Sequence, residues 1–156
     1  MPQLQPPQFQ QARLQLAINV SDLDAAIERY SAILGTAPHK VRDGYANFAV
    51  EQPPLKLVLF EGGEPGHINH LGVEVASTAD VVAETRRLGE LGLDTRVEDG
   101  TVCCHALQDK VWVDAPDGIQ WEVYTVLDDA PEEVEQIAEL SVVGKGASCG
   151  DASCCT

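Results

Sequence analysis

Cysteine is missing from the first 102 residues of this 156-residue chain, and all five cysteines lie between positions 103 and 155. A secreted domain that is stapled by disulfides spreads an even number of cysteines along its length, so the placement argues against a disulfide framework. Clustered thiols in a reducing compartment are instead typical of metal binding or of reactive chemistry. The absence therefore directs attention to the region around Cys103 and Cys104.

Basic residues are also scarce, since 10 Lys and Arg stand against 25 Asp and Glu and give a net charge of −15. Affinity for nucleic acid comes largely from cations that neutralise phosphates, so we expect no nucleic-acid partner. The same charge disfavours an anionic membrane surface. No run of about 18 apolar residues suggests a membrane span, and no basic-led apolar run suggests a signal peptide. We therefore expect a cytoplasmic protein.

The chain does contain an internal repeat with a period of about 55 residues. The first copy shows the patterns of a strand, a helix and three short strands, at 14–20, 22–34, 41–42, 45–50 and 55–60. The second copy repeats this order at 70–75, about 78–91, 94–98, about 102–113 and 120–126. Each helix is followed by a glycine, Gly35 or Gly92, as a helix end requires. The sequence thus predicts an α+β fold of two tandem βαβββ modules with a cleft between them.

Three regions follow from this pattern. Residues 1–12 are rich in Gln and Pro and predict a disordered arm. Residues 13–127 form the folded domain, with module one at 13–62 and module two at 68–127. Residues 128–156 predict an acidic, cysteine-containing flexible tail.

Three side chains from the repeat are candidates for a metal site. Gln15 and His70 open the first strand of each module and are equivalent in the repeat. Glu122 lies among apolar residues in the last strand, and a buried carboxylate is costly unless a cation or a proton offsets it. The matching strand of module one offers only Leu57 or Val58 at that point.

An amide, an imidazole and a carboxylate leave coordination positions open for substrate or dioxygen. The set is a variant of the two-histidine-one-carboxylate triad of non-haem Fe(II) oxygenases, with Gln15 in place of one histidine. A closed set of four ligands would instead favour Zn or Ni acting as a Lewis acid. Taken singly, each residue has an ordinary alternative: His70 as a structural histidine, and Glu122 facing solvent on an edge strand.

The adjacent thiols of Cys103 and Cys104 admit several interpretations. They can chelate a thiophilic atom such as As(III) or Cd(II), form a strained vicinal disulfide, or be two small buried residues. No C-x-x-C spacing supports a structural zinc site. Neighbours in a regular strand point to opposite faces, so the sulfurs converge only if the backbone is irregular there. The tail cysteines, Cys149, Cys154 and Cys155, lack a spacing that fixes a geometry.

Several motifs together resemble one family. They are RLQLAINVSDLDAAIERY, GYANFAVEQPPLKLVL, NHLGVEV and the run from CCHALQDKVWV to PDGIQWEVY, which cover about residues 13–127. They are similar to the ArsI/CadI group, the organoarsenical carbon–arsenic lyases and cadmium-induced proteins of the vicinal oxygen chelate (glyoxalase/dioxygenase) superfamily. The resemblance implies that Gln15, His70 and Glu122 hold Fe(II), for which Ni, Co, Zn or Cd can substitute. It also implies that Cys103 and Cys104 bind the substrate.

The activity implied by the resemblance is Fe(II)-dependent, dioxygen-consuming cleavage of the carbon–arsenic bond in trivalent methyl- or aryl-arsenicals. The alternative is a protein that sequesters Cd(II) or As(III) without turnover. Glyoxalase or isomerase chemistry is disfavoured because the fourth ligand position is apolar, and a catechol dioxygenase gives no reason for the cysteine pair. A monomer and a homodimer are both compatible with such modules.

Overall fold

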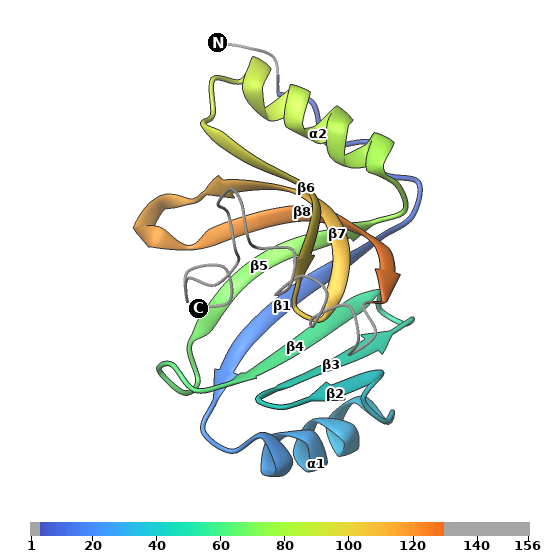
Figure 1. Cartoon of the computed structure of the whole chain (residues 1–156), viewed down its shortest axis with the longest axis vertical. Coiled ribbons are helices and arrows are strands. Elements are labelled where there is room, and N and C mark those ends of the chain that lie inside the picture. Colours follow the sequence, from blue (N-terminus) through green and yellow to red (C-terminus); the bar gives the residue numbers. More distant parts are fainter. Residues whose placement is uncertain (1–3, 130–156) are drawn as a thin grey trace, which may run out of the picture.

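The computed structural model describes residues 4–129, which form one curled sheet of eight strands and two α-helices (Figure 1). The elements of the first module are β1 (Ala12–Val20), α1 (Leu23–Leu34), β2 (Lys40–Arg42), β3 (Tyr45–Val50) and β4 (Leu55–Glu61). Those of the second are β5 (Ile68–Val75), α2 (Thr78–Glu90), β6 (Thr95–Cys103), β7 (Ala106–Asp114), a 3-10 turn (Pro116–Gly118) and β8 (Gln120–Asp129). The predicted α+β class and the tandem repeat are confirmed.

The strand order, β2-β3-β4-β1-β5-β8-β7-β6, is symmetric about its centre. The first strands of the two modules pair there antiparallel, and Gln15 lies opposite Gly72 while Ala17 lies opposite His70. Each first strand also pairs in parallel with the last strand of its own module. The modules therefore join edge to edge into one sheet, and residues 55 positions apart are equivalent, as the repeat predicts.

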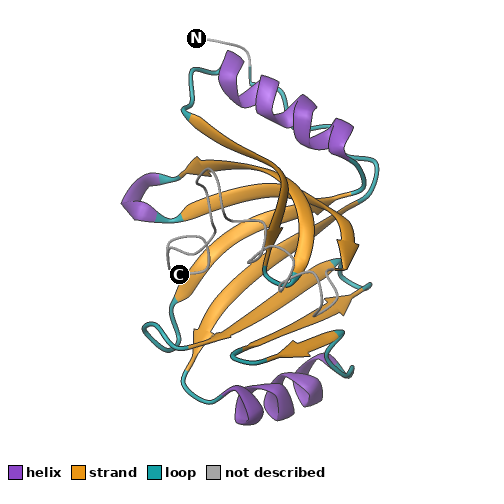
Figure 2. Cartoon of the chain, in the orientation of Figure 1, coloured by secondary structure: helices purple, strands orange, loops and turns teal. Residues whose placement is uncertain are grey.

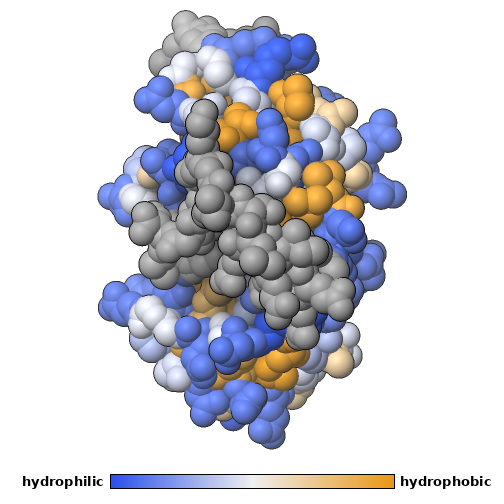
Figure 3. All heavy atoms as spheres, in the orientation of Figure 1, coloured by the Kyte–Doolittle hydropathy of each residue, from blue (hydrophilic) through white to orange (hydrophobic). Residues whose placement is uncertain are grey.

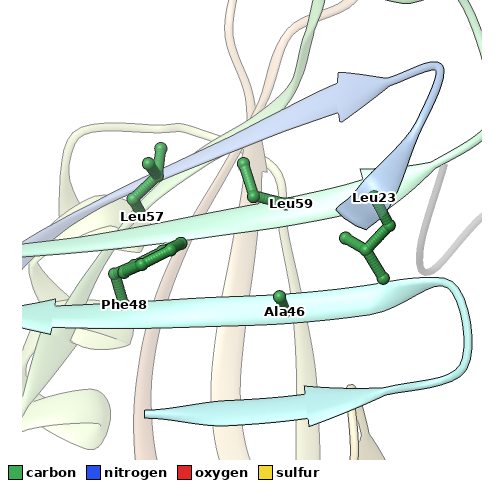
Figure 4. Close-up of a cluster of buried hydrophobic side chains, with 5 residues drawn as sticks. All are labelled: Leu23, Ala46, Phe48, Leu57 and Leu59. Carbon is green, nitrogen blue, oxygen red and sulfur yellow. The ribbon is translucent and has the colours of Figure 1, made fainter. Parts of the chain in front are cut away.

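Helix α1 covers one face of module one. Asp22 caps its start by accepting a hydrogen bond from the backbone N–H of Ala25 at 2.9 Å, and Gly35 ends it in the left-handed conformation that glycine favours. Alternate residues of β3 and β4 point to this helix and bury a core of Leu23, Ala46, Phe48, Leu57 and Leu59 (Figure 4). The intervening residues of the same strands face the other, concave side of the sheet.

Helix α2 packs in the same way on module two, at the opposite end of the molecule from α1 (Figure 2). Ser77 caps it, and its core contains Val75, Val81, Val111 and Val123. Phe9 packs against this cluster, so part of the predicted disordered arm lies on the domain because it carries an aromatic ring to bury.

One predicted strand is wrong. The run at 102–113 is not continuous, because the chain reverses at Cys104 and His105 and divides it between β6 and β7. Both turn residues have positive φ, 53° and 63°, as a tight two-residue hairpin turn of the I′ type requires. Cys and His are not the Asn-Gly pair that is typical of such a turn. The sequence signal for the turn was therefore absent.

The surface agrees with the acidic composition. Among the atoms that Figure 3 colours by hydropathy, hydrophilic residues predominate and apolar residues appear in separate groups. Between residues 4 and 129, no helix is long and apolar enough to cross a membrane. Residues 130–156 of the predicted tail, with Cys149, Cys154 and Cys155, lie outside the described residues.

Candidate metal and thiol site

The structure brings Gln15, His70 and Glu122 together on the concave face of the sheet, from β1, β5 and β8. The Gln15 Nε2 atom is 3.0 Å from His70 Nε2 and 2.6 Å from Glu122 Oε1. His70 Nε2 is 3.2 Å from the same carboxylate oxygen. All three side chains are at least 96% buried, with exposed fractions of 4%, 3% and 3%. Three polar groups thus point at one another inside an otherwise closed interior.

These distances fit a divalent metal. Adjacent ligands of an octahedral ion with bonds of about 2.1 Å lie about 3.0 Å apart, close to the three separations of this triangle. In the structure the Gln15 amide hydrogens lie where a cation would lie, beside the carboxylate. Among residues 4–129, no group of three or more His, Cys, Asp or Glu side chains could hold a metal ion. The site therefore depends on the amide oxygen of Gln15 as its third donor.

His70 is oriented to offer a lone pair to the centre. Its Nδ1 atom is 2.7 Å from Asn69 Oδ1, and the Asn69 amide is itself fixed because its Nδ2 donates to Asn19 Oδ1 at 2.9 Å. When Nδ1–H donates to Asn69 and a metal takes the place of any proton on Nε2, the ring has the form that binds metals. The ring lies 5.4 Å from Trp112 and 6.1 Å from Phe60, centroid to centroid, so aromatic rings limit its rotation.

The Gln15 amide has a partner on its other side. Tyr124 Oη contacts Gln15 Oε1, and it also lies 3.1 Å from Glu74 Oε2. Burial, followed by the nearby carboxylates Glu74 and Glu122, raises the pKa of Tyr124 well above its usual value, so the hydroxyl keeps its single proton. If the amide rotates by 180°, its N–H donates to Tyr124 and the hydroxyl proton goes to Glu74. That rotation turns Oε1 to the centre and leaves the Gln15 amide, Tyr124 and Glu74 each with a hydrogen-bond partner. The surroundings therefore accommodate metal binding.

Glu122 is charged although it is buried. Burial by itself raises the pKa of Glu122, but Lys110 and His70 outweigh the burial and hold the pKa below its usual range. Lys110 Nζ lies 3.1 Å from Glu122 Oε2, and its side chain is 1% exposed. Burial lowers the pKa of Lys110, yet Glu122 and the thiols of Cys103 and Cys104 outweigh it and raise the pKa above its usual value. One carboxylate oxygen is thus held by Lys110 while the other faces the centre.

Gly72 makes room for Glu122. A Cβ atom on Gly72 would lie 2.7 Å from Glu122 Cγ and 2.7 Å from its backbone oxygen, which is closer than real Cβ contacts allow. Only a glycine on β5 lets the carboxylate side chain cross the neighbouring strand toward His70. No local sequence pattern indicates this requirement, and the register between β5 and β8 reveals it.

The thiols converge beside this centre. Cys103 ends β6, Cys104 begins the turn, and their Sγ atoms are 3.4 Å apart as thiols rather than a disulfide. Two bonds of ordinary metal–thiolate length, about 2.3 Å, at roughly 95° place two sulfurs about 3.4 Å apart. The positive φ at Cys104 supplies the irregular backbone that convergence requires. The pair can therefore chelate one thiophilic atom.

Cys104 also connects the thiols to the centre. It lines a small cavity of about 10 Å³ together with all three centre residues, Gln15, His70 and Glu122. A second cavity of about 180 Å³ opens beyond it and shares Tyr45, Lys56, Cys104 and Gln108 as lining residues. Cys104 thus lines both the outer chamber, which can hold a small organic group, and the cavity of the centre.

The curled sheet of two tandem modules, with three polar side chains gathered on its concave face, is typical of the vicinal oxygen chelate fold. The chain belongs to the Glyoxalase/Bleomycin resistance protein/Dioxygenase superfamily, whose family model matches residues 13–123. It is 58% identical over 120 residues to the cadmium-induced protein CadI of Mycobacterium tuberculosis, covering 76% of this chain and 79% of that one. It is 50% identical over 147 residues to a trivalent organoarsenical cleaving enzyme of Thermomonospora curvata, covering 93% and 89%.

Solved structures agree on the fold. Homoprotocatechuate 2,3-dioxygenase from Arthrobacter globiformis matches with a TM-score of 0.59 and 23% identity, over 89% of this chain and 42% of that one. Methylmalonyl-CoA epimerase from Mycobacterium tuberculosis matches with a TM-score of 0.54 and 21% identity, over 86% and 97%. The identification of the family from the sequence motifs is confirmed.

Proposed function

We propose that this protein is an Fe(II)-dependent dioxygenase that cleaves the carbon–arsenic bond of trivalent methyl- or aryl-arsenicals and releases inorganic arsenite. The observation that supports this most strongly is that Cys104 lines the same cavity as Gln15, His70 and Glu122. A site that presents a thiol-bound atom directly to a metal has both halves that such a cleavage needs. The similarity to proteins named trivalent organoarsenical cleaving enzymes supports the same activity.

Substrate binding is assigned to the thiols. A trivalent arsenical with two hydroxyl groups exchanges both As–O bonds for As–S bonds to Cys103 and Cys104, releasing two waters. Lys110, whose charged form is stabilised partly by these thiols, favours the thiolate as nucleophile. The organic group then lies in the outer chamber, next to Tyr45 and Gln108. Chelation by two sulfurs fixes the arsenic in place, which supplies a proximity advantage.

The metal is assigned to Gln15, His70 and Glu122. Bound Fe(II) would supply a redox centre with open positions for dioxygen as co-substrate. Asn69 keeps His70 in its metal-binding tautomer, and Lys110 holds the distal oxygen of Glu122. The aromatic rings of Phe60, Trp112 and Tyr45 exclude bulk water around the centre.

A second function, sequestration of Cd(II) or As(III) without turnover, is favoured by the higher identity to the cadmium-induced relatives, 58% against 50%. It predicts stoichiometric binding that depends on the tail cysteines, Cys149, Cys154 and Cys155, as well as on the central pair. The proposed enzyme depends on the central pair alone.

The test loads the protein with Fe(II) anaerobically, adds phenylarsenite and oxygen, and measures oxygen uptake and inorganic arsenite. We expect turnover in the wild type and in the variant that carries serine at all three tail cysteines. We expect none in Cys104→Ser or His70→Ala. Binding without arsenite in the wild type, lost when the tail cysteines are replaced, would establish sequestration instead.

A further inference from the structure

Lys40 links the thiol-bearing turn of module two to module one. It lies on β2, at one edge of the sheet, whereas the turn joins β6 and β7 at the other edge. The Lys40 Nζ atom donates to the backbone carbonyl oxygen of His105 at 2.9 Å and to Asp129 Oδ1 at 2.5 Å. Only 9% of the Lys40 side chain is exposed. The curl of the sheet brings its two edges together at this point, where the β6–β7 hairpin extends over module one (Figure 1).

Both acceptors of Lys40 lie at the corner where the hairpin turns back. His105 is the second residue of the turn, and Asp129 on β8 lies opposite Ala106, the first residue after it. Burial of Asp129 is slight, and the hydrogen bond from Lys40 holds the pKa of this carboxyl below its usual range, so the pair is ionic at neutral pH. A charge-assisted contact to a main-chain oxygen fixes the backbone of the turn rather than one side chain.

Module one holds the turn by two further contacts. The His105 ring lies 5.3 Å from the Tyr45 ring, centroid to centroid. Cys104 packs against the cluster of Ala17, Tyr45 and Val58 that lines the concave face. These contacts place Cys104 in the wall of the metal cavity. The turn keeps positive φ at two non-glycine residues, a conformation that persists only where the surroundings enforce it.

We infer that Lys40 is a positioning residue, which fixes the Cys104–His105 turn so that an arsenical held by the two thiols faces Gln15, His70 and Glu122. This inference rests on the proposed function. Lys40 lines the outer chamber but not the cavity of the centre, and it acts on the turn through the backbone oxygen of His105. Its neighbour on the same face of β2, Arg42, instead donates to the carbonyl of Val41 in its own strand, and so provides a matched control.

The test compares Lys40→Met, Lys40→Arg and Arg42→Met in the variant without tail cysteines. We expect Lys40→Met to bind phenylarsenite with unchanged stoichiometry but to lose about 10- to 100-fold in kcat, because small misplacements of a reacting group have effects of that size. Its KM should change little. Alkylation of the metal-free protein by iodoacetamide should be several-fold faster at Cys104. Lys40→Arg, which keeps two donors, should restore both properties, and Arg42→Met should match the parent.

Equal kcat and equal alkylation rates in Lys40→Met and the parent would overturn the inference, as would the same change in Arg42→Met. If Lys40→Met does not fold, Asp129→Asn decides, since it weakens the anchor of Lys40. A smaller shift in the same direction supports the inference, and no shift overturns it. Absence of arsenite from the parent itself would remove the proposed function, while the alkylation rates would still decide whether Lys40 holds the turn.

Discussion

Val58 in module one and Glu122 in module two occupy equivalent positions, but only Glu122 has an ionisable side chain. Val58 lies opposite Ala17 on the first strand of its module, and Glu122 lies opposite Gly72. The larger charged side chain is thus accommodated by the smaller neighbour. The difference shows how one copy of a duplicated module can become an apolar wall while the other holds a buried carboxylate.

The same contrast appears on the next strand. By register, Tyr45 of β3 corresponds to Lys110 of β7. A buried tyrosine needs no counter-ion, whereas Lys110 is the counter-ion of Glu122. At these equivalent positions, module two therefore has an anion and its counter-ion where module one has two uncharged residues. Each charge is costly without the other, because an unpaired buried charge is unfavourable.

The hairpins differ in length as well as in composition. Module one turns between β2 and β3 at Asp43-Gly44, just before Tyr45, while β7 begins at Ala106, four positions ahead of the corresponding Lys110. The longer hairpin of module two reaches across to module one and carries the thiols at its tip. The extension of one hairpin thus brings Cys104 to the cavity that Gln15, His70 and Glu122 line from both modules.

Replacement of Glu122 by the residue of module one should have the largest effect. Glu122→Val removes a donor of the proposed metal site and leaves Lys110 buried without a counter-ion, which costs about 3–5 kcal/mol of folding free energy. We expect Fe(II) binding to disappear in anaerobic titration and urea unfolding to shift accordingly. Glu122→Val combined with Lys110→Met should recover most of the stability but none of the metal binding. A double variant as unstable as the single one would contradict the paired-charge account.

Gly72→Ala introduces the residue that module one carries at Ala17. The new Cβ atom meets Glu122 at 2.7 Å, so the carboxylate must shift. We expect about a 10- to 100-fold loss of metal affinity, typical for disturbed support of a ligand, and a loss of about 1–3 kcal/mol from overpacking. Gly89→Ala in α2, where no atom lies within 4 Å of the new Cβ, is the control. Equal metal affinity in Gly72→Ala and the wild type would show that Glu122 does not need this space.

Lys56→Met should give the smallest effect, because it removes a cross-module ion pair that water partly reaches. Burial raises the pKa of Glu74, but Lys56 at 2.7 Å outweighs it and the net pKa is below 4.5. A lowered folded-state pKa means that the ionised carboxylate stabilises the fold above pH 4.5, and that this contribution fades as pH falls through the folded-state value. We expect a loss of about 0.5–1 kcal/mol at pH 7 in urea unfolding. The difference between variant and wild type should shrink below pH 4.5, and a difference that grows there would contradict the assignment.

Local patterns were sufficient to predict the repeat, both helices and the three side chains, Gln15, His70 and Glu122, that the structure brings together. Asp22 and Gly35 indicated the two ends of α1 to within a few residues. The 55-residue period aligned Gln15 with His70. The turn at Cys104-His105 escaped because its residues do not carry the usual turn signal and because tertiary contacts impose its conformation.

The supporting residues could not be found in the sequence, since their roles depend on which strands become neighbours. Gly72 matters only because β5 lies beside β8, and Lys110 only because β7 lies on the other side. Lys40 matters because the sheet curls until its edges meet. Each depends on register or curvature, which arise from packing of the whole sheet rather than from any local pattern.

The most direct test of the central claim is a single turnover in the protein that lacks the three tail cysteines. One equivalent of phenylarsenite is bound anaerobically to the Fe(II)-loaded protein, oxygen is admitted, and inorganic arsenite is counted. Because the thiol turn and the metal centre form one site, we predict close to one arsenite for each protein. Phenylarsenite that stays bound and intact after oxygen is admitted would contradict the account.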